Sequence, residues 1–131
     1  MICFTFPLLL ISTYLLIPLT LAADCANFAS YLQITSYTDA LRAKHAMCDN
    51  TQCGYQQACV VSGTLPRITQ TRKAATVNFE LRRSYSDANG KKGFSYCSNA
   101  IQNLLDLCPT HGWTYGNWKL DNQYYEFALV A

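Results

Sequence analysis

The chain contains 131 residues, half of them hydrophobic, and its formal net charge at pH 7 is +2. This length fits one domain with a core of adequate but not generous size. The sequence has no internal repeat, no low-complexity segment and no Asn-x-Ser/Thr glycosylation motif, so it does not have the composition of a repeat protein or a disordered protein.

The first 22 residues have the pattern of a secretory signal peptide. They carry no charged side chain, and an apolar run over residues 8–17 is followed by Pro18 and by the small-x-small sequence Thr20-Leu21-Ala22. We expect cleavage after Ala22, with cleavage after Ala23 as the alternative. A membrane anchor is the other interpretation, but the run is shorter than the roughly 20 apolar residues that a bilayer requires.

The cysteines predict a disulfide framework over residues 23–131. Of the seven cysteines, Cys3 lies in the signal peptide, and an even set of six remains. An even set in a short secreted chain is typical of paired cysteines in an extracellular domain, and the absence of any Cys-x2-Cys pair argues against zinc. We therefore expect three disulfides, formed by Cys25, Cys48, Cys53, Cys59, Cys97 and Cys108.

In the first half of the chain, the pattern predicts helix and then strands. Residues 25–47 are predicted to form a helical region with a break near residues 36–38, and residues 55–62 are predicted to form a strand. Pro66 begins a loop. Residues 76–83 alternate apolar and polar side chains, which predicts a strand with one buried face and one wet face.

In the second half, residues 95–107 have an apolar stripe at helical spacing, closed by Pro109 and Gly112. Residues 113–120 are predicted to form a hairpin with a turn at residues 116–117, or else a strand. Asp121-Asn122 predicts a further turn, and residues 124–130 predict a last strand. The expected fold is a single small α+β domain, an antiparallel sheet with helices packed on one face and three disulfides.

The predicted helix also limits the pairing of its two cysteines. Cys97 and Cys108 flank it and lie about 16 Å apart along its axis. A disulfide requires Cα atoms within about 7 Å. We therefore predict that the two cysteines bond to different partners outside the helix.

The sequence shows no catalytic, metal-binding or cofactor-binding set. His45 and His111 are the only histidines, and no motif gives either of them a partner. We expect ordinary surface histidines, no catalytic residue, no metal, no cofactor and no nucleic-acid partner.

An aromatic cluster near the carboxyl end supplies the interface candidates. Trp113 and Tyr125 are expected to fill the core, whereas Tyr115, Trp118 and Tyr124 are expected to bind a sugar ring or a protein surface.

Most of the basic charge lies between residues 67 and 92. A solvated basic face is the simpler interpretation of this segment, and attraction of an anionic partner is the alternative. We add Lys91 and Lys92 to the interface candidates.

The stretch Tyr124-Tyr125-Glu126-Phe127 resembles the Tyr-Tyr-Glu-Trp stretch of guanyl-specific fungal ribonucleases. The resemblance implies that Glu126 is a catalytic glutamate, but those enzymes also require an Arg and a His from later strands. Only five residues follow Glu126, and none is Arg or His. We therefore expect edge-strand aromatics here rather than an active ribonuclease.

The last third of the chain resembles small secreted fungal proteins through Cys97-x-x-Ala100-Ile101-x-x-Leu104-Leu105-x-x-Cys108, followed by Gly112-Trp113 and a Tyr-x-Phe strand. Such proteins include cysteine-rich effectors of plant-pathogenic fungi, killer-toxin-like proteins and a mushroom family of glycan-binding lectins.

This resemblance implies a non-enzymatic virulence or avirulence effector that binds a host protein or a cell-surface glycan. It would act in the host apoplast or after translocation into host cells. The alternative is a glycan-binding lectin or a killer-toxin-like antimicrobial protein.

Overall fold

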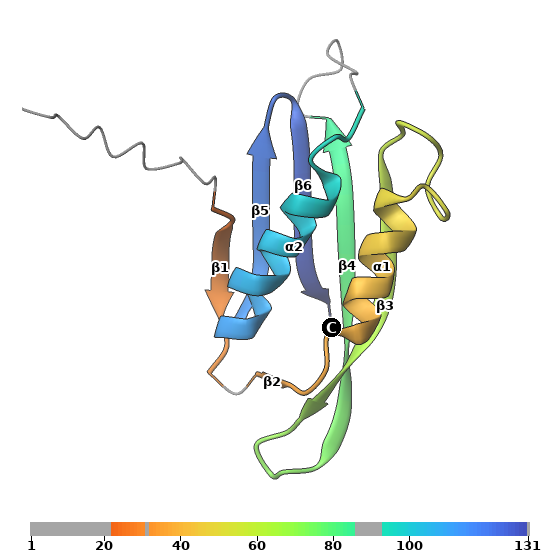
Figure 1. Cartoon of the computed structure of the whole chain (residues 1–131). Helices are drawn as coiled ribbons and strands as arrows, with labels where there is room; N and C mark the ends of the chain where they lie inside the picture. Colours follow the sequence, from red (N-terminus) through yellow and green to blue (C-terminus); the bar gives the residue numbers. More distant parts are fainter. Residues whose placement is uncertain (1–21, 31, 86–92, 131) are drawn as a thin grey trace, which may run out of the picture.

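The computed structural model describes residues 22–30, 32–85 and 93–130 (Figure 1). Residues 1–21 of the expected signal peptide lie outside the described residues, and so do Lys91 and Lys92. Within the described ranges, no helix is long and apolar enough to cross a membrane.

The described residues form one antiparallel sheet of six strands, which are neighbours in the order β1-β5-β6-β4-β3-β2 and make up most of the fold (Figure 1). The central strands are long and pair without a break in register, whereas the edge strand β2 pairs only with the last two residues of β3. The strands are β1 Asp24–Phe28, β2 Gln33–Ile34, β3 Cys59–Ile68, β4 Ala74–Tyr85, β5 Trp113–Leu120 and β6 Gln123–Val130.

Alternation along the strands creates one buried side of the sheet. In β4, Phe79 and Leu81 are fully buried, while Asn78 and Arg82 are exposed. Phe127 of β6 lies opposite Leu81 and is also fully buried. This period of two confirms the two strands that the sequence predicts most clearly.

Two α-helices pack against the sheet. Helix α2 (Cys97–Leu107) contacts β5 and β6, α1 (Thr38–Cys48) packs chiefly on β3, and the two helices contact each other. The short 3-10 helix η1 (Pro109–His111) follows α2 and ends at Gly112, whose φ of +85° fits the left-handed conformation that glycine favours. The buried stripe of α2 is Ala100, Ile101, Leu104 and Leu105.

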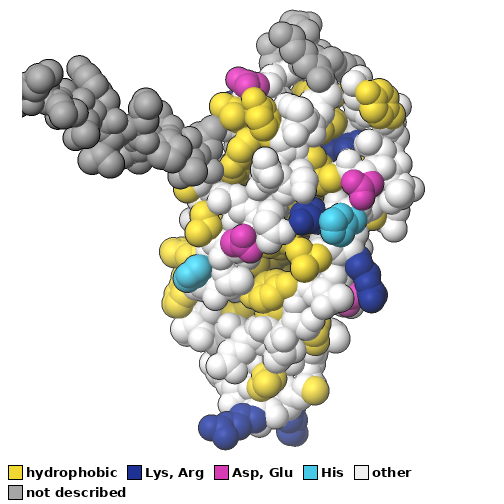
Figure 2. Space-filling view, viewed as in Figure 1, with side chains coloured by type: hydrophobic (Ala, Val, Ile, Leu, Met, Phe, Trp, Pro, Cys, Tyr) yellow, Lys and Arg dark blue, Asp and Glu magenta, His cyan; other side chains and the backbone are white. Residues whose placement is uncertain are grey.

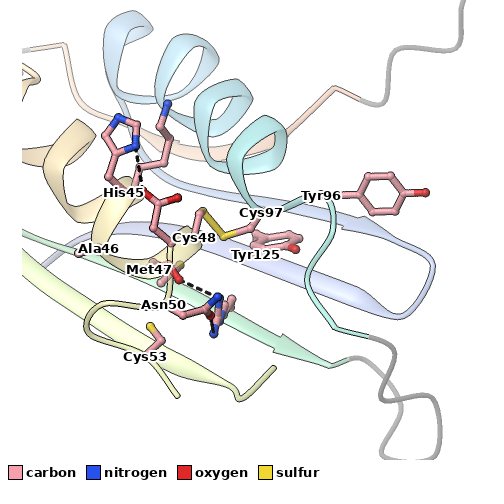
Figure 3. Close-up of a disulfide and its surroundings, with 12 residues drawn as sticks. His45, Ala46, Met47, Cys48, Asn50, Cys53, Tyr96, Cys97 and Tyr125 are labelled. Atoms are coloured by element: carbon pink, nitrogen blue, oxygen red, sulfur yellow. Dashed lines mark hydrogen bonds and ion pairs between the residues drawn. A yellow bond between two sulfur atoms is a disulfide. The ribbon is translucent and has the colours of Figure 1, made fainter. Parts of the chain in front are cut away.

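Three disulfides link the described cysteines, as the even count predicts. Cys25 of β1 bonds to Cys108 at the end of α2, with Cα atoms 5.4 Å apart. Cys48 of α1 bonds to Cys97 at the start of α2, as Figure 3 shows. The prediction that the two cysteines flanking the helix have different partners is therefore confirmed.

The third disulfide, Cys53–Cys59, closes the loop that precedes β3. Together with the antiparallel sheet, the three bridges confirm a small single domain of the expected class. The sheet is its main component.

The first part of the predicted helical region at 25–47 is wrong. Residues 24–28 form β1, which pairs with β5 and is tied to α2 by Cys25. Only the second part is helical, as α1. Pairing with a strand about ninety residues later outweighs the weak helical spacing of this segment.

The strand expected at residues 55–62 begins later, at Cys59, and continues through Pro66 instead of ending before it. Proline fits at this position because the Pro66 carbonyl accepts a hydrogen bond from the Thr35 N–H at 3.0 Å, on the side away from β4. The missing proline N–H therefore removes no bond from the β3–β4 ladder.

The hairpin expected at residues 113–120 is also wrong, because these residues form the alternative, one continuous strand, β5. Gly116 allows α2 to lie close to β5 and does not form a turn. A Cβ at this residue would collide with Cys108 Sγ and would lie 3.0 Å from the Leu104 side chain. The turn predicted at Asp121 and Asn122 is confirmed: both residues have positive φ, and they connect β5 to β6.

A buried arginine holds the loop between α1 and β3. Arg83 of β4 is only 1% exposed. Its guanidinium donates to the carbonyl oxygens of Met47 at 2.8 Å, Gln57 at 2.9 Å and Gly54 at 3.0 Å, and to Asn50 Oδ1 at 2.8 Å. The planar fork of arginine makes these bonds at fixed angles, so one side chain orders the whole loop.

The aromatic ring of Phe94 completes the site of Arg83. The guanidinium carbon lies 4.5 Å from the centre of that ring. Burial lowers the pKa of the Arg83 guanidinium below its ordinary value, because the charged form loses water. The carbonyl oxygens and the ring face replace that water.

We predict that Arg83→Lys lowers the free energy of unfolding by about 2–4 kcal/mol, because lysine cannot reach four acceptors at once. Arg82→Lys, on the exposed side of the same strand, is the matched control and should change stability by less than about 0.5 kcal/mol. Guanidinium chloride unfolding at pH 7 measures both. Equal stability of the two variants would contradict the structural role of Arg83.

Candidate functional site

The side of the sheet opposite the buried residues carries a hydrogen-bonded cluster on β5 and β6. Tyr115, Tyr124 and Glu126 alternate along their strands with the buried Gly116, Tyr125 and Phe127, so they project from the outer side. All three are partly exposed. We call these three residues the tyrosine–glutamate cluster.

The three side chains form a chain of hydrogen bonds. The Tyr115 hydroxyl donates to Glu126 Oε2 at 3.2 Å, and the hydroxyl oxygens of Tyr115 and Tyr124 are 3.1 Å apart. Because a phenol has one proton, donation from Tyr115 to Glu126 leaves Tyr124 as the donor to Tyr115. The order is therefore Tyr124 to Tyr115 to Glu126, which fixes both rings on the sheet.

This arrangement keeps Tyr124 neutral. Partial burial raises its pKa above the ordinary value of 10.0, and the hydrogen bond to Tyr115 and the negative charge of Glu126 raise it further. Each of these effects opposes a second negative charge next to the carboxylate. The cluster therefore presents one carboxyl group, two hydroxyl groups and two aromatic rings.

Basic side chains flank the cluster on neighbouring positions. Arg82 of β4 lies directly opposite Glu126 in the ladder, and Lys119 of β5 lies opposite Tyr124. Both are exposed. The outer side thus alternates acidic, basic and aromatic groups, a mixture that suits recognition of a polar partner.

A second aromatic pair lies at the end of β1 and β5. Phe28 is 60% exposed and meets Trp113 edge-on, with ring centres 5.5 Å apart. Phe28 also lies opposite Trp113 in the β1–β5 ladder. An exposed phenylalanine held in place by a tryptophan is a fixed apolar contact on the surface.

The structure brings two of the expected interface residues together on the outer side of the sheet and places a third in the core. Tyr115 and Tyr124 are hydrogen-bonded in the cluster, as described. Trp118 is only 7% exposed and packs in the core between the rings of Tyr96 and Tyr125, both with centres 5.7 Å from its own. Its expected role as a surface anchor is wrong, because Trp118 lies on the buried side of β5.

The basic segment at residues 67–92 is divided among different environments. Arg67, Arg72 and Lys73 lie near the end of the β3–β4 hairpin, where Figure 2 shows basic side chains gathered at the tip of the molecule. Arg83 is buried, so it is not part of a solvated face. The interface candidates Lys91 and Lys92 lie outside the described residues.

Sequence reasoning missed Phe28 and Arg82. The spacing of Phe28 looked helical, and only its pairing with β5 places it beside Trp113. Arg82 comes from a strand earlier in the chain than Glu126, whereas the ribonuclease resemblance points only to basic residues after Glu126. The alternation of residues 76–83 did place Arg82 on the wet side of its strand.

The histidines lie away from the cluster. His45 belongs to α1 and His111 to η1, where the His111 ring contacts the Leu107 carbonyl oxygen at 3.0 Å. In the part of the chain that the structure describes, no three or more His, Cys, Asp or Glu side chains are grouped as metal ligands.

Comparison of the chain with protein-family models, with curated proteins and with solved structures finds no match. A function for the tyrosine–glutamate cluster is therefore argued from the geometry of its residues.

We predict that Trp118→Ala lowers the free energy of unfolding by about 3–5 kcal/mol, because it leaves a cavity between two aromatic rings. Lys119→Ala, the next residue on β5 and exposed, is the control and should have little effect. Denaturant unfolding followed by tryptophan fluorescence for the control, and by circular dichroism for both variants, measures the difference. A stable Trp118→Ala variant would return this residue to the surface candidates.

Stability should fall at alkaline pH. Since the folded-state pKa of Tyr124 lies above 10.0, the unfolded chain loses this proton first as the pH rises past that value. The folded state then binds more protons than the unfolded state, and the free energy of unfolding decreases. Tyr124→Phe should make this decrease shallower between about pH 10 and about pH 11, as denaturant unfolding at each pH will show.

Proposed function

We propose that this protein is a secreted effector of a plant-associated fungus that binds a host protein and does not catalyse a reaction. The three disulfides fit an oxidising, extracellular compartment. The signal-peptide pattern of the first 22 residues and the effector resemblance of the last third support the same conclusion.

The tyrosine–glutamate cluster is the observation that carries the proposal. Tyrosine is enriched in protein interfaces because its ring supplies apolar area and its hydroxyl a hydrogen bond. Here the bond from Tyr115 to Glu126 and the bond between the two tyrosines hold both hydroxyl groups in place before any partner arrives. Such preorganisation reduces the entropy that binding would otherwise cost.

The layout of the domain supports a binding role for the outer side of the sheet. In this proposal both helices cover the opposite side, consistent with the buried residues of β4 and β6, and leave the outer side for a partner. The residues from Phe28 and the partly buried Trp113 to the cluster then supply aromatic and charged groups on this side. A small molecule needs a concave pocket, so an open face of this kind fits another protein better.

Glycan binding by a lectin or a killer-toxin-like protein is the second candidate. The aromatic rings and the fixed carboxylate of the cluster are groups that also bind sugars, by stacking and by hydrogen bonding to hydroxyl groups. The two candidates predict different effects on binding when host proteins or host glycans are destroyed.

We therefore predict saturable binding of the labelled protein to plant leaf tissue, lost after protease treatment and kept after periodate oxidation of sugars. Tyr124→Ala should weaken this binding about tenfold or more, because it removes a fixed aromatic anchor, while Lys119→Ala should have a smaller effect. Loss of binding after periodate, together with hits on a glycan array, would favour the lectin. Absence of saturable binding to untreated leaf tissue would contradict both the effector and the lectin candidates.

A further inference from the structure

The outward edge of β3 is open over its first part. The short strand β2 pairs only with Arg67 and Ile68, so it covers the end of β3 that is nearest the hairpin tip. Toward Cys59, the described chain places no strand on this edge. In Figure 1, β2 lies near the lower end of β3, and α1 lies in front of its upper part.

The direction of the free backbone groups follows from Pro66. In an antiparallel strand the N–H and C=O of one residue point to the same side, and this side alternates along the chain. The Pro66 carbonyl accepts from Thr35, so it points to the outer edge. The unbroken register of β3 then directs the backbone groups of Thr64, Ser62 and Val60 to that same edge.

These groups are available for pairing. No described residue forms a backbone hydrogen bond with Val60, Ser62 or Thr64 on the outer edge. All three side chains are exposed, Val60 by 45%. Uncharged edge residues with three free donors and three free acceptors form a template for another strand.

A hollow of about 310 Å³ lies beside this edge, between β3 and α1. Its apolar part is formed by Ala43 and Ala46 of α1, Val61 and Gly63 of β3 and the ring of Phe79. Polar and charged side chains also line it: Asp39, Arg42, Gln52, Ser62 and Thr64. A Cβ at residue 63 would lie 2.8 Å from two ring atoms of Phe79. Because Gly63 lacks a side chain, the Phe79 ring lies close to it and lines part of the hollow.

We propose that β3 and α1 bind an extended peptide segment of a partner protein, which adds an antiparallel strand next to Val60–Thr64. Hydrogen bonds to the three outward residues would hold its backbone. The side chain opposite Gly63 would enter the hollow and contact Phe79, so the segment carries an apolar residue there. Backbone pairing combined with side-chain pockets at alternate positions is an established way to bind peptides.

A second copy of this chain fits the edge less well than a peptide does. Neighbouring strands lie about 4.8 Å apart, whereas packed helices need axes about 8–10 Å apart. Since α1 packs chiefly on β3, pairing two β3 edges would bring two copies of α1 too close together. A single extended segment carries no such helix. This site is separate from the tyrosine–glutamate cluster and does not depend on it.

Proline at residue 62 tests the backbone part of the proposal. Ser62→Pro removes an outward N–H and leaves the β3–β4 ladder intact, and the strand already accepts a proline on the same edge at Pro66. Ser62→Ala is the matched control, since it keeps the N–H. Ala46→Leu tests the side-chain part, because the larger residue fills the hollow.

The probe is a phage-displayed library of random eight-residue peptides, selected on the full chain after expression through a secretory pathway. We expect enriched peptides with an apolar residue at a constant position. They should bind Ser62→Pro and Ala46→Leu about tenfold more weakly than Ser62→Ala in fluorescence anisotropy. Peptides with one N-methylated backbone amide should lose binding to the unaltered protein, which tests the pairing even if Ser62→Pro does not fold.

Three results would overturn the proposal. The first is no enrichment beyond that on an unrelated disulfide-bonded protein. The second is equal binding of the peptides to Ser62→Pro and Ser62→Ala when both are folded. The third is a concentration-dependent dimer that Ser62→Pro abolishes, which would assign the edge to a second copy of the chain.

Discussion

Helix α2 is covalently fixed at both ends, and the remaining architecture depends on this. Cys97, the first residue of α2, is bonded to Cys48 at the end of α1. Cys108, which directly follows the last residue of α2, is bonded to Cys25 of β1. These bridges join positions 49 and 83 residues apart. In the chain-entropy description, each such closure is worth about 4 kcal/mol, comparable with much of the net stability of a small domain.

With its ends fixed, α2 must present its apolar stripe to β5 and β6. This decides which residues of those strands are buried, and therefore which residues are left on the outer side. Trp118 and Tyr125 enter the core, while Tyr115 and Tyr124 stay near the surface. The disulfides that hold α2 thus influence which groups of β5 and β6 are left on the outer side.

Sequence reasoning succeeded where the information is local. The stripe of α2 and the alternation in β4 and β6 are properties of short windows, and the structure confirms these elements. The distance between Cys97 and Cys108 along a helix was enough to exclude one disulfide. The turn at Asp121 and Asn122 was also readable, because those residue types tolerate positive φ.

Sequence reasoning failed where contacts with residues far away in the chain decide which element a residue joins or which side of the sheet it faces. Phe28 becomes a strand residue only by pairing with β5, and no local pattern shows this. Gly116 looks like a turn residue until α2 is placed against it. Trp118 belongs to the aromatic cluster that the sequence places near the carboxyl end, and only its position on the continuous strand β5, on the same side as Gly116, puts its side chain in the core.

The site of Arg83 has a consequence for how freely its loop can vary. Three of its four acceptors are backbone carbonyl oxygens, of Met47, Gly54 and Gln57, and these exist whatever the side chains are. Exposed residues such as Tyr55 can therefore change in size or charge while the loop keeps its shape. Among the residues it contacts there, only Asn50 is tied to Arg83 by its own side chain. Selection acting on this loop can alter its surface without disturbing the domain that carries it.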